Sequence, residues 1–589
     1  MVALPCAPDP ECEPATPVWS PNGKRLVFVL RAPKTTHRFV YETDPNGGTP
    51  RKLVDFEGTI GDPRFSNSGE LAVLATAGAH KEIGATQPGA PIVGVIGGDA
   101  DEQRIAIVGR DGKLVFASPP DLFVYEYGWR PSGGFVGTAA HGNGDNNWWI
   151  ARLYAFASPG GTPQAHEIYA PSEPQQQIAN PRVSPDGRSV AFIGGLMSDF
   201  GSTGGDVYTV PIGGGTATDE TTHFQASATS LAWSCSATPS DVARLEFGVL
   251  RGGEMELDGV TPAPQAAAVR LRSFGETNVS NITRACAGGV ERLAFVRQTF
   301  ETPPEIYVTS GNDATPVQLT HVNDGLAAST VARSVAWKSD GAIVHGWLLA
   351  PVHVDTSKKH PLIMSVHGGP AAAALPRFIA RGTERQLLSA GYYIFYPNPR
   401  GSFGGGESFT RGNVEDFGYG DLRDDLAGID AAEKAAPIDD ARLGIMGGSY
   451  GGFMSMWAVT QTHRFKASVA SAGIANWVSY YGENGIDEWM IPYFGASVYD
   501  DPGVYRKSSP IEFIKRVTTP SLILVGERDV ECPPPQSQEY WHALDTLGVP
   551  TQLVIYAGEG HGLRQPKDRA DAMKRTVQWF DRYLMQHAS

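Results

Sequence analysis

The sequence lacks the features by which several classes of protein are recognised. It has no run of basic residues, and its formal net charge of -15 opposes any role that depends on neutralising the phosphates of a nucleic acid. No apolar stretch approaches the ~18 residues of a membrane-spanning helix, so no membrane partner is expected. The first residues, MVALPCAPDPECEP, lack the basic and apolar regions of a secretory signal, and a cytoplasmic protein is therefore expected.

Cysteine is scarce, and its spacing excludes common metal sites. The chain has 5 cysteines, without a CxxC pair or a Cys/His cluster, so a structural zinc site is not expected. Disulfides could join Cys6 to Cys12, or Cys235 to Cys286, but reduced thiols are expected in a cytosolic protein. No Walker loop or dinucleotide fingerprint is present, and we expect no cofactor and no metal.

The length of the chain predicts two large domains. At 589 residues it exceeds the roughly 250 to 300 residues that one hydrophobic core normally supports. Hydrophobic residues make up 41% and charged residues 19%, which is typical of globular proteins rather than disordered chains.

The N-terminal half contains a weak repeat of a turn followed by a short strand. The copies include PVWSPNGKRLVFVL (17–30), PRFSNSGELAVLAT (63–76) and PRVSPDGRSVAFIGG (181–195). Because a propeller blade needs about 40 to 50 residues, the pattern predicts a β-propeller of about seven blades over residues 1–330. A pair of β-sandwiches or another all-β array is the alternative.

After residue 330, buried strands alternate with longer helical patterns. Stretches such as PLIMSV, LGIM, SLILVG and TQLVIY are continuous apolar runs, and helical spacing follows most of them. This alternation predicts an α/β-hydrolase domain with a mostly parallel sheet over residues 331–589.

The strongest chemical signal is the segment Gly447-Gly448-Ser449-Tyr450-Gly451, which lies between an apolar strand and a helix. A sharp strand-to-helix turn that presents a serine needs small residues two positions before and two positions after it. Gly447 and Gly451 meet that need. The segment therefore predicts that Ser449 is a nucleophile.

A serine nucleophile needs a base, and the base needs an acid to orient it. Asp529 ends the strand SLILVG, and His561 follows the strand TQLVIY, so each is expected where a loop leaves the carboxyl edge of the sheet. Glu527 and Glu531 are nearby rivals of Asp529. The position of Asp529 at the end of its strand favours it as the acid, and the position of His561 after the last strand favours it as the base.

Two backbone amides are candidates for an oxyanion hole. The residue after the nucleophile, Tyr450, supplies one amide, and Gly369 in the segment His367-Gly368-Gly369-Pro370 can supply the other. The alternative for this second segment is a simple tight turn.

Taken together, these motifs resemble those of the prolyl oligopeptidase family of serine peptidases, especially its acylaminoacyl-peptidase and dipeptidyl-aminopeptidase-like branch. The resemblance spans most of the chain and rests on HGGP (367–370), NPRGS (398–402), GGSYGG (447–452), the GxxD element that ends at Asp529, and GEGHG (558–562).

The resemblance implies a catalytic triad of Ser449, Asp529 and His561, with the amides of Gly369 and Tyr450 as the oxyanion hole. It also implies a propeller that covers the site and excludes large folded proteins, which leaves peptides as substrates. The family often forms dimers or larger assemblies, so a homo-oligomer is an open alternative, although nothing in the sequence fixes the number of subunits.

One residue departs from the family pattern. Members of the acylaminoacyl branch commonly carry arginine two residues after the catalytic aspartate, where this chain has Glu531. If Glu531 faces the cleft, it would attract a cationic substrate group, such as a free amino terminus. The alternative is a solvated loop glutamate.

Further substrate-binding candidates come from the aromatic stretch 476–494 and from the NPRGS motif. Trp477, Tyr481, Trp489 and Phe494 could line an apolar specificity pocket, with Trp489 first among them, or could simply pack a core. Arg400 could position the substrate, or an ion pair of Arg400 could hold its loop.

The acidic segment 420–426 carries Asp421, Asp424 and Asp425. These residues are expected to complement a helix dipole, without a catalytic role.

The sequence thus predicts a serine peptidase that hydrolyses short peptides through an acyl-enzyme, of the acylaminoacyl-, dipeptidyl- or oligopeptidase type. The substrates would be short peptides or small acyl compounds. A carboxylesterase on the same scaffold is the first alternative, and a non-catalytic propeller scaffold is the second.

Overall fold

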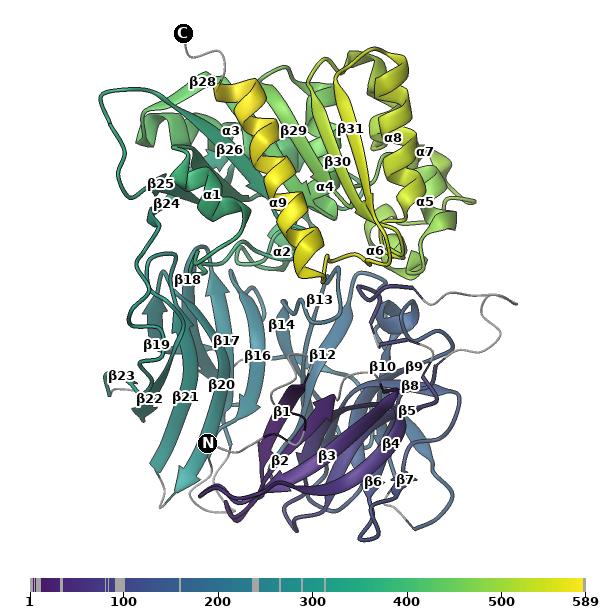
Figure 1. The fold of residues 1–589 in the computed structure, drawn as a ribbon. Helices are drawn as coiled ribbons and strands as arrows, with labels where there is room; N and C mark the ends of the chain where they lie inside the picture. Colours follow the sequence, from purple (N-terminus) through teal and green to yellow (C-terminus); the bar gives the residue numbers. More distant parts are fainter. Residues whose placement is uncertain are drawn as a thin grey trace. The chain divides into compact units, whose positions relative to one another are not determined.

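The structure is a computed structural model that describes residues 4, 6, 12–31, 35–79, 81–82, 84–89, 101–157, 160–235, 243–263, 266–287, 290–311 and 314–585 (Figure 1). The chain packs as two compact units. The first comprises Met1–Ala85, Ala90–Gly194 and Val207–Asp219, and the second comprises Thr86–Gly89, Gly195–Asp206 and Glu220–Ser589.

The first unit is built from antiparallel strands. Its first sheet runs in chain order through β1 (Glu13–Trp19), β2 (Leu26–Arg31), β3 (His37–Thr43), β4 (Arg51–Phe65), β5 (Leu71–Ala77), β6 (Arg104–Val108) and β7 (Leu114–Phe116). The long strand β4 pairs with β3 through its first half and with β5 through its second half. The sheet therefore consists of two four-stranded groups that share β4.

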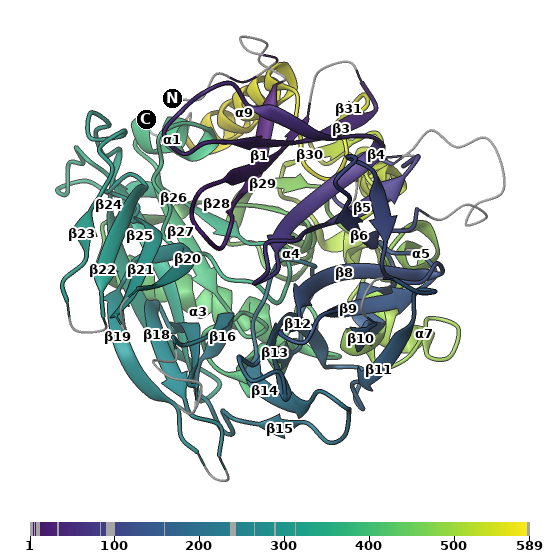
Figure 2. The same ribbon diagram turned by 90° about the horizontal axis from the view of Figure 1, so that it is seen from below.

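Two four-stranded sheets follow. The strands β8 (Leu122–Trp129), β9 (Phe135–His141), β10 (Arg152–Phe156) and β11 (Ala165–Tyr169) lie side by side (Figure 2), with the short helix η1 (Asn147–Ile150) between β9 and β10. The next sheet contains β12 (Gln177–Val183), β13 (Ser189–Gly195), β14 (Asp206–Pro211) and β15 (Thr218–Asp219).

The predicted repeat corresponds to one recurring turn. In its three clearest copies, a glycine amide donates to the carbonyl of a serine three residues earlier: Gly23 to Ser20, Gly69 to Ser66, and Gly187 to Ser184. Each of these glycines has a positive φ, of 66°, 89° and 72° respectively, which favours glycine. Each turn joins two neighbouring strands, β1 to β2, β4 to β5 and β12 to β13, so the turn signals mark equivalent places in three of the groups.

The second unit begins its regular structure with two more antiparallel sheets. One contains β16 (Ser227–Trp233), β17 (Leu245–Arg251), β18 (Glu254–Val260) and β19 (Val269–Gly275), and the other contains β20 (Asn278–Ala287), β21 (Val290–Gln298), β22 (Glu305–Ser310) and β23 (Val317–Gln318). In the part of the chain that the structure describes, six four-stranded groups therefore precede β24. The expected number of about seven blades stays a prediction.

An eight-stranded mixed sheet completes the second unit. Its order is β24-β25-β27-β26-β28-β29-β30-β31, and only the β24–β25 and β25–β27 pairs are antiparallel. The bounds are β24 (Thr330–Ser339), β25 (Ala342–Pro351), β26 (His360–Val366), β27 (Tyr393–Asn398), β28 (Ile438–Gly448), β29 (Phe465–Ser471), β30 (Ser521–Gly526) and β31 (Thr551–Tyr556). The mostly parallel sheet expected from the apolar runs is thus present.

Helices connect the strands of this sheet. They are α1 (Thr383–Ser389), α2 (Glu407–Thr410), α3 (Gly420–Ala435), α4 (Tyr450–Gln461), α5 (Trp477–Glu483), α6 (Met490–Phe494), α7 (Pro502–Lys507), α8 (Pro534–Thr546) and α9 (Pro566–Phe580), with the short helical turns η2 (Arg411–Asn413), η3 (Asp487–Trp489), η4 (Pro510–Arg516) and η5 (Asp581–Met585).

One hydrophobic cluster of this unit lies between the sheet and helices α1 and α9. Helix α9 begins at a proline, whose fixed φ suits the first helical position, and it lies across the sheet (Figure 1). Its Trp579 and Phe580 share one buried cluster with Leu387 of α1 and with Ile363 and Leu522 of the sheet. Within the described residues, no helix is long and apolar enough to cross a membrane.

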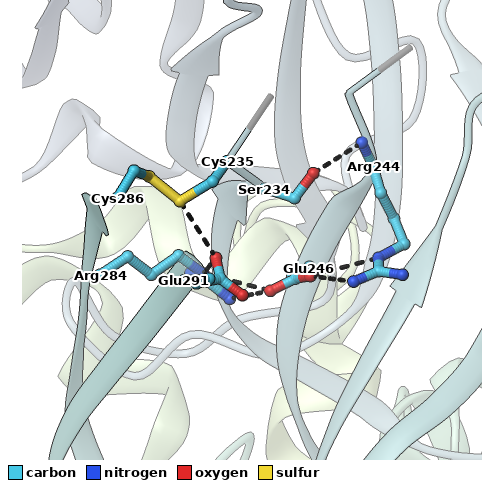
Figure 3. The surroundings of a disulfide bond; sticks show 7 residues. All are labelled: Ser234, Cys235, Arg244, Glu246, Arg284, Cys286 and Glu291. Atoms are coloured by element: carbon cyan, nitrogen blue, oxygen red, sulfur yellow. Dashed lines mark hydrogen bonds and ion pairs between the residues drawn. A yellow bond between two sulfur atoms is a disulfide. The ribbon is translucent and has the colours of Figure 1, made fainter. Parts of the chain in front are cut away.

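The cysteine expectation is wrong, because four of the thiols are joined in pairs. Disulfides connect Cys6 to Cys12 and Cys235 to Cys286, at Cα separations of 5.6 and 5.9 Å that lie within the range such bonds require. The second disulfide links the end of β16 to β20, next to an ion-pair network that includes Glu291 (Figure 3). The remaining cysteine, Cys532, is free and buried.

Candidate active site

The predicted nucleophile lies at a strained turn between β28 and α4. Ser449 has φ 59° and ψ -123°, a conformation that non-glycine residues rarely adopt. Its amide donates to the carbonyl of Ser471 at 3.0 Å, and its carbonyl accepts from the amide of Phe453 at 2.9 Å. These bonds hold the turn, because they tie it to β29 on one side and to the first turn of α4 on the other.

The glycines around Ser449 are required by close backbone contacts. A Cβ on Gly447 would lie 2.4 Å from the carbonyl oxygen of Gly451, and a Cβ on Gly451 would lie 2.1 Å from that of Val366. Both distances are far below a normal contact. By contrast, a Cβ on Gly448 would have its nearest neighbour, the carbonyl oxygen of Ser471, at 3.8 Å. The small residues two positions either side of Ser449 are therefore needed, as the sequence predicted.

Asp529 and His561 lie together at the carboxyl edge of the sheet, beyond β30 and β31. The Nδ1 atom of His561 lies 2.9 Å from Oδ2 and 3.1 Å from Oδ1 of Asp529. The carboxylate of Asp529 is oriented by the amides of Glu531 and Cys532, which donate to Oδ1 at 3.0 and 2.8 Å. This geometry fixes the ring so that Nδ1 donates to Asp529 and Nε2 faces the other way.

The partner of Nε2 is Glu531. Its Oε2 atom lies 3.1 Å from His561 Nε2, and the Glu531 side chain is only 7% exposed. Glu531 is therefore not a solvated loop residue, and that alternative is wrong. No hydrogen bond joins the side chains of Ser449 and His561 among the described residues; the Ser449 side chain instead interacts with the Cys532 thiol.

Acidic neighbours control the protonation of this histidine. Burial alone would lower the pKa of His561, but the carboxylates of Asp529, Glu531 and Asp199 together raise it to about 9. Asp199 belongs to the loop between β13 and β14, and its carboxylate accepts a hydrogen bond from Ser198 at 3.0 Å. Burial raises the pKa of Asp199, against the opposing effects of Ser198 and His561.

The two proposed oxyanion donors line one pocket with Ser449. Gly369 has φ 122°, and Tyr450 is the first residue of α4. Neither backbone amide makes a hydrogen bond within the described residues. A first-turn helical amide has no partner within its helix, so Tyr450 N–H is free to bind an anion. Whether the two amides act as an oxyanion hole stays a prediction.

Only part of the lining of this pocket is apolar, because the polar residues Asp199, Ser449 and Glu531 also line it. Of the aromatic residues predicted for it, Trp489 does line the pocket, and its Nε1 donates to the Tyr480 hydroxyl at 3.3 Å. Tyr480, Ile474 and Ile486 complete the apolar wall. The cavity volume is only about 10 Å³, room for at most about one water molecule, so a substrate side chain can enter only if a group moves.

Three other aromatic candidates lie outside the lining of this pocket. Trp477 and Phe494 are buried and contact each other in a cluster around Phe417. Tyr481 is half-buried and packs edge-on against Tyr499 and Tyr505. Here the core-packing alternative describes the geometry.

Arg400 also lies away from the pocket, where it holds its loop to α3. Its guanidinium makes two bonds to Asp424 and one to Asp340, which is the ion-pair alternative of the sequence analysis. Asp421, Asp424 and Asp425 lie in the first turns of α3, and all three are fully buried. Asp421 accepts a hydrogen bond from the Tyr450 hydroxyl, so this segment packs behind the nucleophile turn.

Several pocket residues were not anticipated. Tyr480 adjoins the predicted Tyr481, and the helical register of α5 decides which of the two rings points inward. Asp199 is separated from Gly369, the next site residue along the chain, by 170 positions and carries no local motif, so no sequence signal marks it. The described residues include no group of three or more His, Cys, Asp or Glu side chains placed to hold a metal ion.

Known proteins resemble this chain in sequence and in fold. Residues 380–587 match the model of the prolyl oligopeptidase family, which confirms the resemblance predicted from the motifs. The uncharacterized peptidase YuxL of Bacillus subtilis is 35% identical over 298 residues, which make up 48% of this chain and 44% of that protein. Dipeptidyl-peptidase 5 of Porphyromonas gingivalis is 25% identical over 416 residues, 69% of this chain and 59% of that protein.

These two matches cover about half the length of each relative. The solved structure of Pyrococcus horikoshii acylaminoacyl peptidase, in uncomplexed form, superposes with a TM-score of 0.76 at 23% identity and covers 98% of this chain and 89% of that one. At that identity, the likeness concerns the fold alone.

Proposed function

We propose that this protein is a serine peptidase that hydrolyses short peptides through an acyl-enzyme at Ser449. The observation that carries the proposal is the convergence on one pocket of Ser449 at its strained turn and two free amides, together with a histidine that Asp529 orients and that contacts Glu531 of the same pocket. The likeness of residues 380–587 to a peptidase family supports it.

In the proposed mechanism, His561 first gives up its contact with Glu531 and its Nε2 proton, and the neutral Nε2 then takes the proton from the Ser449 hydroxyl as the oxygen attacks the substrate carbonyl. The amides of Gly369 and Tyr450 donate hydrogen bonds to the resulting oxyanion. His561 then gives the proton to the leaving amine, and the acyl group stays on Ser449. Water, activated by the same imidazole, hydrolyses this ester and restores the free enzyme. Asp529 stabilises the imidazolium that forms in each half of the cycle.

The decisive experiment labels the protein with a fluorophosphonate and measures hydrolysis of aminoacyl p-nitroanilides. Ser449→Ala should abolish the label and lower kcat by roughly 10³- to 10⁶-fold. Ser389→Ala, which removes an exposed hydroxyl on α1, is the matched control and should change neither. A Ser449→Ala variant that hydrolyses at the wild-type rate would refute the assignment.

The same assay separates the alternative functions. Esters are intrinsically easier to cleave than amides, so matched p-nitrophenyl esters are measured beside the p-nitroanilides. Activity confined to the esters would favour a carboxylesterase, and a protein that neither reacts with the label nor turns over either substrate would favour a non-catalytic scaffold.

We also infer that the strands before β24 form a β-propeller gating domain over residues 1–330, with a hydrolase domain over 331–589. The four-stranded antiparallel groups and the start of the mixed sheet at Thr330 support this division. A cytoplasmic location, a homo-oligomeric state and the absence of nucleic-acid partners stay predictions. The two disulfides weigh against the first, because such bonds persist mainly in oxidising compartments.

A further inference from the structure

Three carboxylates surround a single cation in the candidate site. Asp529 accepts from Nδ1 of His561, and Glu531 lies 3.1 Å from Nε2. Asp199, from a different loop, lies close enough to His561 for its charge to act on the imidazole, and it lines the same pocket as Glu531 and Ser449. Asp529 and Glu531 thus flank the imidazole on its two nitrogens, and Glu531 is the one of the two that also lines the pocket.

We propose that Glu531 and Asp199 bind a cationic substrate group, the free amino terminus of a short peptide, and that this group takes the Glu531 carboxylate away from His561. The inference rests on the proposed function, because it concerns the same serine and histidine. It makes Glu531 a specificity-determining and positioning residue.

The ion pair with Glu531 opposes the role of His561 as a base. An imidazole can accept the serine proton only through a neutral Nε2, whereas a carboxylate beside that atom favours the protonated ring. An incoming ammonium group brings three N–H donors and a positive charge. When it pairs with Glu531 and Asp199, it removes the partner of the imidazolium and repels its proton, which passes from Nε2 to solvent.

An acylated amino terminus cannot do this. It carries no charge, so it leaves the pair of His561 and Glu531 intact, and the enzyme must lose the same proton without help. Peptides with a free amino terminus should therefore be better substrates than their acylated counterparts. The geometry points to a peptidase that discriminates at the amino end of its substrate.

Two further titratable groups among the described residues, Cys532 and Tyr480, lie beside these carboxylates and carry no charge near neutral pH. Burial, followed by the nearby carboxylates, raises the pKa of the Cys532 thiol well above its usual value, and burial likewise raises the pKa of the Tyr480 hydroxyl. Exchange of partners between the ammonium and the imidazolium is thus governed by Asp529, Glu531 and Asp199. The apolar wall of Trp489, Ile474 and Ile486 is left to receive a substrate side chain.

The test compares four substrates: Phe-p-nitroanilide, Gly-Phe-p-nitroanilide, and the N-acetyl derivative of each. Values of kcat/KM are measured between about pH 5 and 7, where the α-amino group stays protonated. For the wild type, we expect the free-amine member of at least one pair to be preferred. For Glu531→Gln, the ratio of free to acetylated substrate should fall at least about tenfold.

The pH profile supplies a readout that a purely structural role would not move. With the acetylated substrate, wild-type kcat/KM should rise about tenfold per pH unit over this range, because His561 must lose its proton. Without the Glu531 carboxylate, that rise should level off at lower pH. The matched control is Glu527→Gln, an exposed glutamate on the same loop, which should keep the wild-type ratio and profile.

An unchanged ratio and an unchanged profile in Glu531→Gln would overturn the inference. If that variant does not fold, Asp199→Asn carries the same test. The ratio of free to acetylated substrate should fall in it as well, and an unchanged ratio would overturn the inference. The inference also fails if the wild type prefers both acetylated substrates. Failure of the proposed function looks different: no substrate would then be hydrolysed in a Ser449-dependent way.

Discussion

Arg400 and Asp424 form a two-point ion pair, in which Nε and Nη2 of the guanidinium donate to different carboxylate oxygens at 2.9 and 2.7 Å. The Arg400 amide donates to the same carboxylate at 2.8 Å. Asp424 is fully buried and Arg400 is 16% exposed, so the pair joins the NPRGS loop to α3 from within the protein.

Removing this arginine should therefore destabilise the fold. Arg400→Ala leaves the Asp424 charge buried without its main partner, and we expect the free energy of unfolding to fall by about 3 kcal/mol. The midpoint of guanidinium unfolding measures the change. Arg423→Ala is the control, because Arg423 pairs with the same Asp340 at the exposed surface and should shift the midpoint little. Equal midpoints for the two variants would contradict this prediction.

The turn at Ser449 gives a second prediction, which contrasts two adjacent glycines. Gly447→Ala places a methyl group 2.4 Å from a backbone oxygen, so the turn must shift. We expect kcat to fall at least about 100-fold, because misplacement of a catalytic group by about 1 Å can cost this much. Gly448→Ala meets only an ordinary contact at 3.8 Å and should keep most of the activity. Steady-state kinetics on one p-nitroanilide compares the two variants, and similar losses in both would show that the contacts at Gly447 do not matter.

Much of the architecture could be predicted because its signals are local. Five consecutive residues specify the turn around Ser449. Asp529 and His561 each follow an apolar strand whose carboxyl end lies at one edge of a parallel sheet. The turn glycines at Gly23, Gly69 and Gly187 mark equivalent hairpins for the same reason. Such features depend on neighbours within a few positions of the chain.

Contacts between distant segments could not be read in this way. Nothing in the residues around Asp199 indicates that its carboxylate lies near His561, more than 360 positions later. The sequence placed Asp421 and Asp424 near the start of a helix, but it did not indicate their burial, which depends on the long-range partners Tyr450 and Arg400. Trp477 and Trp489 have similar local sequence contexts, and only the tertiary packing decides which of them lines the pocket.

The buried Asp421 should make stability depend on pH. Burial raises its pKa to about 7, against the opposing hydrogen bond from Tyr450. Between about pH 4 and 7 the unfolded chain loses this proton while the folded protein retains it, so the contribution of Asp421 to stability declines as pH rises, by up to about 1.4 kcal/mol per pH unit. Below that window both states are protonated, and above it both are ionised.

Asp421→Asn removes this dependence, because an amide does not ionise. Relative to the wild type, the variant should gain stability as the pH is raised from 4 to 7. The measurement is the guanidinium midpoint of unfolding of both proteins at each pH. Asp430→Asn, on the exposed side of the same helix, controls for the loss of one negative charge. Parallel curves for the wild type and Asp421→Asn would show that the carboxyl group is ionised throughout.

The two disulfides should stabilise the fold to different degrees, because they close loops of different size. Cys235 and Cys286 are 51 residues apart, whereas Cys6 and Cys12 are 6 apart. If a cross-link acts mainly by restricting the unfolded chain, the larger loop contributes about 4 kcal/mol and the smaller about 2 kcal/mol. The double variant Cys235→Ser/Cys286→Ser should therefore lower the unfolding midpoint more than Cys6→Ser/Cys12→Ser does.

A thiol titration of denatured, unreduced protein checks the premise: Cys532 alone should react, and all 5 cysteines should react after reduction. Five reactive thiols before reduction would mean that neither bond forms in the isolated protein, and the expected difference between the two variants would then disappear.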